Sequence, residues 1–256
     1  AFKISLMAFA ALFALAFPAR AIVGGAKPHL DGVGRAVVVI VGSRGNFCSG
    51  AAIARDLVLT AAHCVLPVAD YKIVRYQDGA KPALIDTDKI MRHPQFSLAS
   101  LQGQRATADV ALIKLANPLP DGISPAPVGA PRLPINPGAR FTIAGAGVAR
   151  AGDGTSGGTV RAVDLIATGR PGTLQIRLMD PNTKANAAGL GACTGDSGAP
   201  AFEDQNGRAI IIGVVSWSTG PNLSAGCGGL TGLTPLNLYR DWILQAARQL
   251  GTPLAP

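Results

Sequence analysis

The sequence predicts an all-β protein, a barrel or a sandwich, with one helix near its C-terminal end. Among its 256 residues, 32 glycines and 19 prolines favour many turns over long helices. Short segments rich in β-branched and other apolar residues recur between these turn signals, which is typical of barrels and sandwiches. With 48% hydrophobic and 15% charged residues, the chain has the composition of a compact globule of one large or two small domains.

The predicted strands either alternate apolar and polar residues, as half-buried strands do, or are apolar throughout, as strands buried on both faces are. In chain order they are residues 36–41, 52–60, 110–115, 140–144, 160–167, 175–178 and 210–217. A Pro-rich stretch at residues 118–137 divides the chain roughly in half and is predicted to be a linker.

A helix is predicted at residues 235–250, because apolar residues recur there at helical spacing and fall on one face. The residues of that face are Leu238, Trp242, Ile243, Ala246 and Leu250. The helix is expected to pack this face against the β-rich core.

Residues 1–21 are predicted to be an export signal peptide. Lys3 provides a positive charge, residues 4–17 are apolar, Pro18 breaks a helix, and residues 19–21 form an A-x-A cleavage motif. The apolar run is shorter than the ~20 residues that a membrane-spanning helix needs. We therefore expect a secreted protein, extracellular or periplasmic, with no membrane association after signal removal.

The charge and the cysteines limit the classes of partner and cofactor. The formal net charge is +8, but the basic residues are scattered and form no cluster of the kind that binds nucleic acid. Four cysteines in an exported chain predict two disulfides, with three pairings open. Because their spacing matches no metal-binding pattern, we expect no metal and no cofactor.

Three polar residues in distant segments could form a nucleophilic centre. Ser197 lies in a Gly-Asp-Ser-Gly turn, where glycines let backbone N–H groups approach a substrate carbonyl. A serine hydroxyl is a poor nucleophile unless a positioned base takes its proton. His63 follows one apolar strand and Asp109 precedes another, so a buried aspartate could hold the imidazole with its second nitrogen toward Ser197.

The order of these residues along the chain separates the mechanistic families. All three histidines precede Ser197, which excludes the Ser-Asp-His order of α/β-hydrolases. Asp31 could supply the Asp-His-Ser order of subtilisins, but the surroundings of His63 and Ser197 differ from that family. The order His63, Asp109, Ser197 remains.

Five motifs in this order resemble the chymotrypsin/trypsin-like serine peptidases, and they cover essentially the whole chain after the signal peptide. They are IVGG at residues 22–25, the segment from CSG to TAAHC at residues 48–64, DVALIKL at residues 109–115, CTGDSGAP at residues 193–200 and VSW at residues 215–217. The resemblance implies two six-stranded antiparallel β-barrels with the active site in the cleft between them. It places the N-terminal barrel at residues 22–127, and the C-terminal barrel and helix at residues 128–256.

The resemblance also implies the roles of the site residues. It pairs Cys48 with Cys64 and Cys193 with Cys227. The backbone N–H groups of Gly195 and Ser197 would form the oxyanion hole, and residues 216–218 would bind the substrate backbone as an added strand.

An activation ion pair is a further implication of the resemblance. The new amino group of a mature Ile22 would pair with the buried Asp196, which needs such a partner. Because residues 19–21 directly precede Ile22, signal removal itself could expose this amine without a zymogen step. A second A-x-A motif at residues 14–16 would instead leave a five-residue propeptide, residues 17–21. We favour direct exposure, because Pro18 belongs in a cleavage region.

The expected specificity pocket departs from that of trypsin-like enzymes. Gly191 stands six residues before Ser197, where those enzymes carry an aspartate. A pocket without charge at its base cannot offset the desolvation of Arg or Lys, so we predict a neutral residue at P1, the position before the scissile bond. Either Glu203 or Asp204 could reach the pocket and reverse this prediction. The expected lining residues are Gly191, Ser216, Trp217, Ser218 and Gly232, with Ser218 in place of the usual glycine and narrowing the entrance.

The sequence therefore predicts a secreted, monomeric serine endopeptidase that cleaves protein or peptide substrates through an acyl-enzyme. A protein inhibitor is a second expected kind of partner. The alternative is a catalytically weak or inactive member of the family, acting as a basic secreted binding protein. Retention of all three triad residues argues against that alternative.

Overall fold

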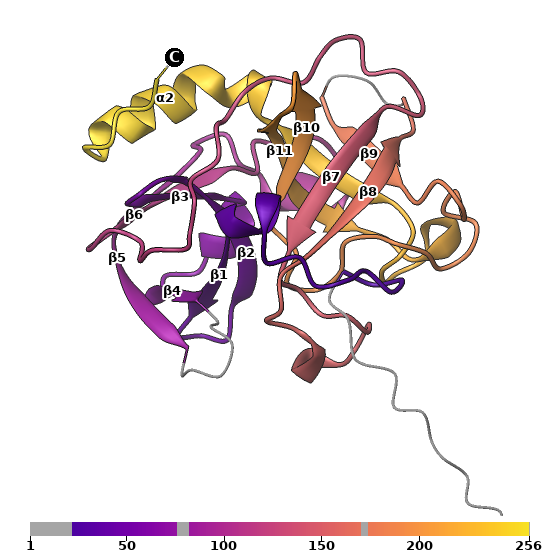
Figure 1. The fold of residues 1–256 in the computed structure, drawn as a ribbon, viewed down its shortest axis with the longest axis horizontal. Helices are drawn as coiled ribbons and strands as arrows, with labels where there is room; N and C mark the ends of the chain where they lie inside the picture. The colour runs from indigo at the N-terminus through magenta and orange to yellow at the C-terminus, as the bar shows by residue number, and fades with distance from the viewer. Residues whose placement is uncertain (1–21, 76–81, 170–173, 256) are drawn as a thin grey trace, which may run out of the picture.

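The computed structural model describes residues 22–75, 82–169 and 174–255, so the predicted signal peptide lies outside the described residues. Within them the strands form two closed six-stranded antiparallel barrels. Figure 1 shows the two barrels side by side, with the C-terminal helix packed across one side of the molecule. The fold class predicted from the sequence is confirmed.

The first barrel is built from apolar, β-branched segments whose side chains fill its interior. Its closed strand order is β1-β2-β3-β6-β5-β4. The strands are β1 (Val37–Gly42), β2 (Phe47–Ala54), β3 (Leu57–Thr60), β4 (Tyr71–Arg75), β5 (Ala83–Arg92) and β6 (Ala111–Leu115).

The second barrel follows the same plan, with closed order β10-β11-β12-β9-β8-β7. Its strands are β7 (Arg140–Gly145), β8 (Arg161–Ala167), β9 (Ile176–Met179), β10 (Pro200–Gln205), β11 (Arg208–Ser218) and β12 (Thr231–Pro235). A separate apolar cluster draws buried residues from both barrels and from the C-terminal helix, which joins the barrels into one body.

Helices are few and short. The α-helices are α1 (Leu98–Gln102) and α2 (Arg240–Gln249), and the 3₁₀ turns are η1 (Gly32–Ala36), η2 (Ala62–Val65), η3 (Gly154–Ser156), η4 (Pro221–Leu223) and η5 (Leu236–Tyr239). Helix α2 buries Ile243 and Ala246 as predicted, whereas Leu238 is 41% exposed, so its place on the buried face is wrong. The reason is that Leu238 lies in a 3₁₀ turn, whose period of three differs from that of an α-helix.

Every predicted strand segment contains a strand, but residues 52–60 hold parts of two strands, β2 and β3, joined by a turn at Arg55 and Asp56. Strands β4, β5, β10 and β12 were not predicted from the sequence. Strand β5 is mostly half-buried or exposed and so lacks an apolar run, and β12 carries a glycine and a proline. These strands are recognisable only from their partners across the sheet.

The predicted linker between the barrels is tied to both of them. Ala126 N donates to Ala52 O of the first barrel, and Gly129 N donates to Ile211 O of the second, each at 2.9 Å. The chain therefore crosses between barrels along a bonded path rather than as a loose tether.

Both disulfides have the expected pairing, Cys48 with Cys64 and Cys193 with Cys227. Cys64 of the first disulfide directly follows His63, and Cys193 of the second lies four residues before Ser197. In the described part of the chain, helices are too short and too polar to span a bilayer.

Candidate active site

His63 and Asp109 are brought together by the pairing of two strands in the first barrel. His63 lies in the 3₁₀ turn after β3, Asp109 lies just before β6, and Thr60 of β3 pairs with Ala111 of β6. His63 Nδ1 is 2.8 Å from Asp109 Oδ2, and the backbone N of His63 donates to Asp109 Oδ1 at 2.9 Å. The fully buried Asp109 therefore holds His63 by one contact with the ring and one with the backbone, and the ring contact leaves Nε2 available.

The hydroxyl of Ser216 donates to the same aspartate oxygen, Asp109 Oδ2, at 2.6 Å. Ser216 belongs to β11 in the second barrel, so this bond links the barrels at the His63–Asp109 pair. Sequence reasoning assigned Ser216 only a backbone role and missed this side-chain role. The VSW motif marked the residue, but no sequence signal gave the direction of its hydroxyl.

Ser197 sits on a tight turn that both barrels hold. The neighbouring Gly195 and Gly198 have φ of +91° and +78°, which side chains disfavour. A Cβ on Gly198 would lie 2.1 Å from Thr60 Oγ1 of the first barrel. Ser49 N donates to Ser197 O at 2.9 Å, so the nucleophile loop is also bonded across the barrel interface.

Ser49 also fixes the peptide group next to the nucleophile. Its hydroxyl donates to Gly195 O at 2.8 Å and accepts from Ala146 N at 3.0 Å. With that carbonyl held inward, the neighbouring backbone is in a defined orientation. Such a fixed turn can present backbone N–H groups to a developing oxyanion.

Asp196 is a fully buried carboxylate beside the nucleophile. It accepts from Gly147 N at 2.8 Å and from Cys193 N at 2.9 Å. Burial raises its pKa from the ordinary 3.8 to about 7, although the two backbone N–H groups and the charge of Arg161 act in the opposite direction. Glycine is needed at position 147, because a Cβ there would lie 2.6 Å from the Asp196 carboxyl carbon.

A cleft of about 440 Å³ runs between the barrels beside these groups. Residues of both barrels line it, and none of them carries a carboxylate or a basic side chain other than the imidazole. They are Asn46, Phe47, Cys48, His63, Cys64, Cys193, Thr194, Gly195, Ser197, Ser218, Gly226 and Cys227. His63 and Ser197 therefore share one solvent-accessible space.

Gly191, the expected base of the specificity pocket, lies beside two residues that were not among the predicted lining residues. A Cβ on Gly191 would lie 3.3 Å from Gly228 Cα and 3.5 Å from Thr231 Oγ1, so these three residues lie together. Gly232 instead lies beneath Trp217, since a Cβ there would be 2.1 Å from the Trp217 ring. A register shift between Val215 and Trp217 causes this offset, and no sequence pattern revealed it.

Glu203 and Asp204, which could have supplied a charge to the pocket, both lie far from it. Glu203 and Asp204 pair with Ile210 and Ala209 at the turn end of the β10–β11 hairpin. Ser218 lies eight residues beyond Ile210 on β11, which corresponds to about 26 Å of strand. Glu203 accepts from Arg132 N in the segment between the barrels, and Asp204 accepts from Gly207 N in the hairpin turn, so both carboxylates have partners away from the pocket.

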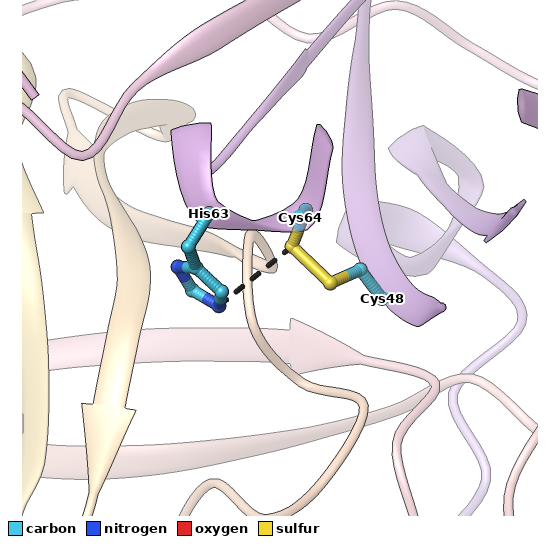
Figure 2. Close-up of side chains that lie close together, drawn as sticks. All are labelled: Cys48, His63 and Cys64. Carbon is cyan, nitrogen blue, oxygen red and sulfur yellow. Dashed lines mark hydrogen bonds between the residues drawn. A yellow bond between two sulfur atoms is a disulfide. The ribbon is translucent and has the colours of Figure 1, made fainter. Parts of the chain in front are cut away.

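The sulfur atoms near the imidazole do not form a metal centre. Cys48, His63 and Cys64 place ligand-type atoms within 4.8 Å of one another. Figure 2 shows that the two sulfurs are bonded to each other, with the imidazole Nε2 3.9 Å from Cys64 Sγ. Because metals bind thiolates, this disulfide offers no ligand to a metal ion.

Comparison with known proteins agrees with this geometry. The family model described as Trypsin matches residues 22–243. The chain is 30% identical over 217 residues to a trypsin of Phaedon cochleariae, covering 77% of this chain and 78% of that protein. It is 25% identical over 228 residues to the snake venom serine protease rhinocerase 4 of Bitis rhinoceros, covering 87% and 86% of the two chains.

Other relatives are much longer than this chain. Human serine protease 56 is 30% identical over 219 residues, which covers 77% of this chain and 34% of that protein. Rat transmembrane protease serine 9 is 28% identical over 241 residues, covering 82% of this chain and 21% of that protein.

Proposed function

Because the chain belongs to the trypsin family of serine proteases, we propose that it is an active endopeptidase with Ser197 as nucleophile, His63 as general base and Asp109 as the group that orients the base. The observation that carries this proposal is the buried Asp109, which binds both the ring and the backbone of His63 beside a cleft that contains Ser197. This is the geometry by which an aspartate selects the imidazole tautomer for proton transfer.

The proposed reaction is acyl transfer through Ser197. Ser197 Oγ attacks the substrate carbonyl carbon, and its proton passes to His63 Nε2. The negative oxygen that forms is stabilised by the N–H groups of Gly195 and Ser197. His63 then gives the proton to the leaving amine, the C–N bond breaks, and an acyl-enzyme remains. Water, deprotonated by His63, releases the acid and restores Ser197.

A neutral P1 residue fits the uncharged surroundings of Gly191. We expect kcat/KM for peptides with Ala, Val, Leu or Phe at P1 to exceed that for Arg or Lys by roughly 10- to 100-fold, because burying an unpaired cation costs about 1–3 kcal/mol. A fluorogenic peptide panel varied only at P1 measures this ratio. A preference for Arg or Lys would contradict the pocket assignment while leaving the catalytic assignment intact.

We further propose that the amino group of a processed Ile22 pairs with Asp196. Ile22 is fully buried within the apolar core of the second barrel, and the next residue, Val23, pairs with Gly191 near the cleft. The chain is thus already seated at the second barrel. The positively charged amino group of a processed Ile22 would stabilise the charged form of the Asp196 carboxyl group.

This pairing predicts a difference in pH dependence between two forms of the protein. With the chain continuous through Ile22, the pKa of Asp196 is about 7, above its ordinary 3.8. The folded state then binds more protons than the unfolded state over this range, so the free energy of unfolding falls as pH rises from about 4 to about 7. A chain that begins at Ile22 should lose less stability over the same rise in pH, because its amino group lowers the pKa of Asp196.

Urea unfolding at several pH values between 5 and 8 tests this prediction on two chains, one starting at Phe17 and one at Ile22. The Asp196→Asn variant of each is the control, because it should remove the difference in pH dependence. Identical pH dependence of the two unsubstituted chains would exclude the proposed pair.

We also propose that the protein is secreted and that its two halves meet between residues 127 and 128. The A-x-A motif at residues 19–21 supports export followed by release of Ile22. N-terminal sequencing of exported protein should find Ile22 first, whereas Phe17 first would exclude direct activation. We assign residues 22–127 and 128–256 to the two halves, because the linker reaches the second barrel at Gly129.

A further inference from the structure

Trp217, Gly232 and Arg177 form a row across three neighbouring strands. Trp217 of β11 pairs directly with Gly232 of β12, and Gly232 pairs directly with Arg177 of β9. Residues that pair in this way share one face of the sheet. Because Gly232 has no side chain, the Trp217 indole lies over it, and the Arg177 guanidinium carbon is 5.4 Å from the ring centroid. That distance is within the range of a cation–π contact.

The charge of Arg177 is not matched by a carboxylate among the described residues. The ion pairs found in that part of the chain do not include it. Its Nε is buried without a hydrogen-bond partner, and its Nη2 lies 3.4 Å from the neutral amide oxygen of Gln175. Guanidinium groups ordinarily pair with carboxylates when they are partly buried, so this one can still accept an anionic partner.

A second cation lies at the same corner. Gln175 Nε2 donates to Gln104 O at 3.4 Å, which brings the segment after α1 against the start of β9. The residue after Gln104 is the exposed Arg105. The corner beside Trp217 is therefore positively charged, and the residues that line the neighbouring cleft contribute no carboxylate.

The last residues of β11 have an open edge beside this corner. Strand β10 ends its pairing at Val214, whereas β12 continues along the other edge as far as Ser218. Thr219 exchanges two backbone hydrogen bonds with the β12 side, to Leu230 O and from Gly229 N. Successive residues alternate between the two edges, so counting back from Thr219 places Trp217 on the β12 side. The peptide groups of Ser216 and Ser218 therefore face the open edge.

A peptide that binds at this edge is placed by the same alternation. An added antiparallel strand with P1 opposite Ser216 has P3 opposite Ser218. The side chains of P2 and P4 then lie on the face of Trp217. P2 is nearer to His63, and P4 lies about 7 Å farther along, away from the scissile bond. P4 is thus the position whose side chain can cross the indole toward Arg177.

We propose that Arg177, stacked on Trp217 across Gly232, forms a subsite for an acidic side chain at P4 of the peptide substrate. This inference rests on the proposed endopeptidase function and adds the class of substrate, peptides with Asp or Glu four residues before the cut. Arg105 adds to the attraction. Lysine at P4 is disfavoured by the same two charges.

The test uses internally quenched peptides identical except for Glu, Gln or Lys at P4, with one neutral P1 residue. For the wild-type enzyme we expect kcat/KM to be about three- to tenfold higher for Glu than for Lys, the range for partly screened charge pairs. The Arg177→Gln variant should bring this ratio close to one. Arg177→Lys should restore part of the ratio, and added salt should reduce it.

Arg208→Gln is the matched control, because it removes the same charge at an exposed position on the β10–β11 hairpin. It should leave the Glu-to-Lys ratio unchanged. A wild-type enzyme that cleaves the three peptides equally, or an Arg177→Gln variant that keeps the full ratio, would overturn the subsite. Cleavage of none of these peptides, nor of any peptide in the P1 panel, would instead overturn the proposed function.

Discussion

Replacing Ser197 with alanine is expected to lower kcat for peptide hydrolysis by about 10⁶-fold, because a triad works as a unit and loses nearly all of its effect when the nucleophile is removed. Ser197 is the hydroxyl residue on the strained turn between Gly195 and Gly198, and it lines the same cleft as His63. The loss of one hydroxyl should not disturb the fold, since the Ser197 bonds that hold the turn come from its backbone.

Single-turnover and steady-state rates with the best P1 peptide measure this effect. Ser124→Ala is the matched control, because Ser124 is exposed in the linker between the barrels and lies outside the cleft. Circular dichroism should show the same fold for both variants. Wild-type rates in a folded Ser197→Ala protein would exclude Ser197 as the nucleophile.

Replacing Asp109 with asparagine should reduce kcat by about 10⁴-fold near neutral pH, with little change in KM. The carboxylate of Asp109 accepts from His63 Nδ1, His63 N and Ser216 Oγ. An asparagine has one acceptor oxygen and one NH₂ group, so its NH₂ must face one of these donors. If it faces Nδ1, the imidazole takes the tautomer whose Nε2 already carries a proton and cannot accept that of Ser197.

The Ser216→Ala variant provides the comparison, because it removes only one of the three donors and leaves the carboxylate. We expect it to lower kcat by roughly tenfold, on the scale of one charge-assisted hydrogen bond. Steady-state kinetics on the same peptide compares the two variants. An Asp109→Asn enzyme within tenfold of wild type would show that Asp109 does not orient the general base.

The parts of the site that sequence reasoning identified are those fixed by local motifs. The turn around Ser197, the segments of His63 and Asp109, and both disulfides follow from residue types, chain order and the family resemblance. The structure brings two of these residues together, with His63 Nδ1 2.8 Å from Asp109 Oδ2, although they are 46 positions apart in the chain.

The parts that sequence reasoning missed depend on how strands align across the sheet. The hydroxyl of Ser216 reaches Asp109 only because β11 of one barrel faces the other barrel. Thr231 lies beside Gly191, and Gly232 lies beneath Trp217, in a β11–β12 pair whose register shifts between Val215 and Trp217. The contact of Arg177 with Trp217 depends on the register of β11 with β12 and on that of β12 with β9. Neither register can be predicted from the sequence of one strand alone.

The most direct measurement is covalent labelling of the protein with a fluorophosphonate, followed by mass spectrometry of its peptides. An activated serine displaces fluoride and forms a stable phosphorus ester. We expect one equivalent of label per chain, located on Ser197, with peptide hydrolysis lost in proportion to labelling and with slower labelling of the Asp109→Asn variant. Complete labelling of Ser197 with hydrolysis unchanged, or inhibited protein whose label lies on another residue, would contradict Ser197 as the catalytic nucleophile.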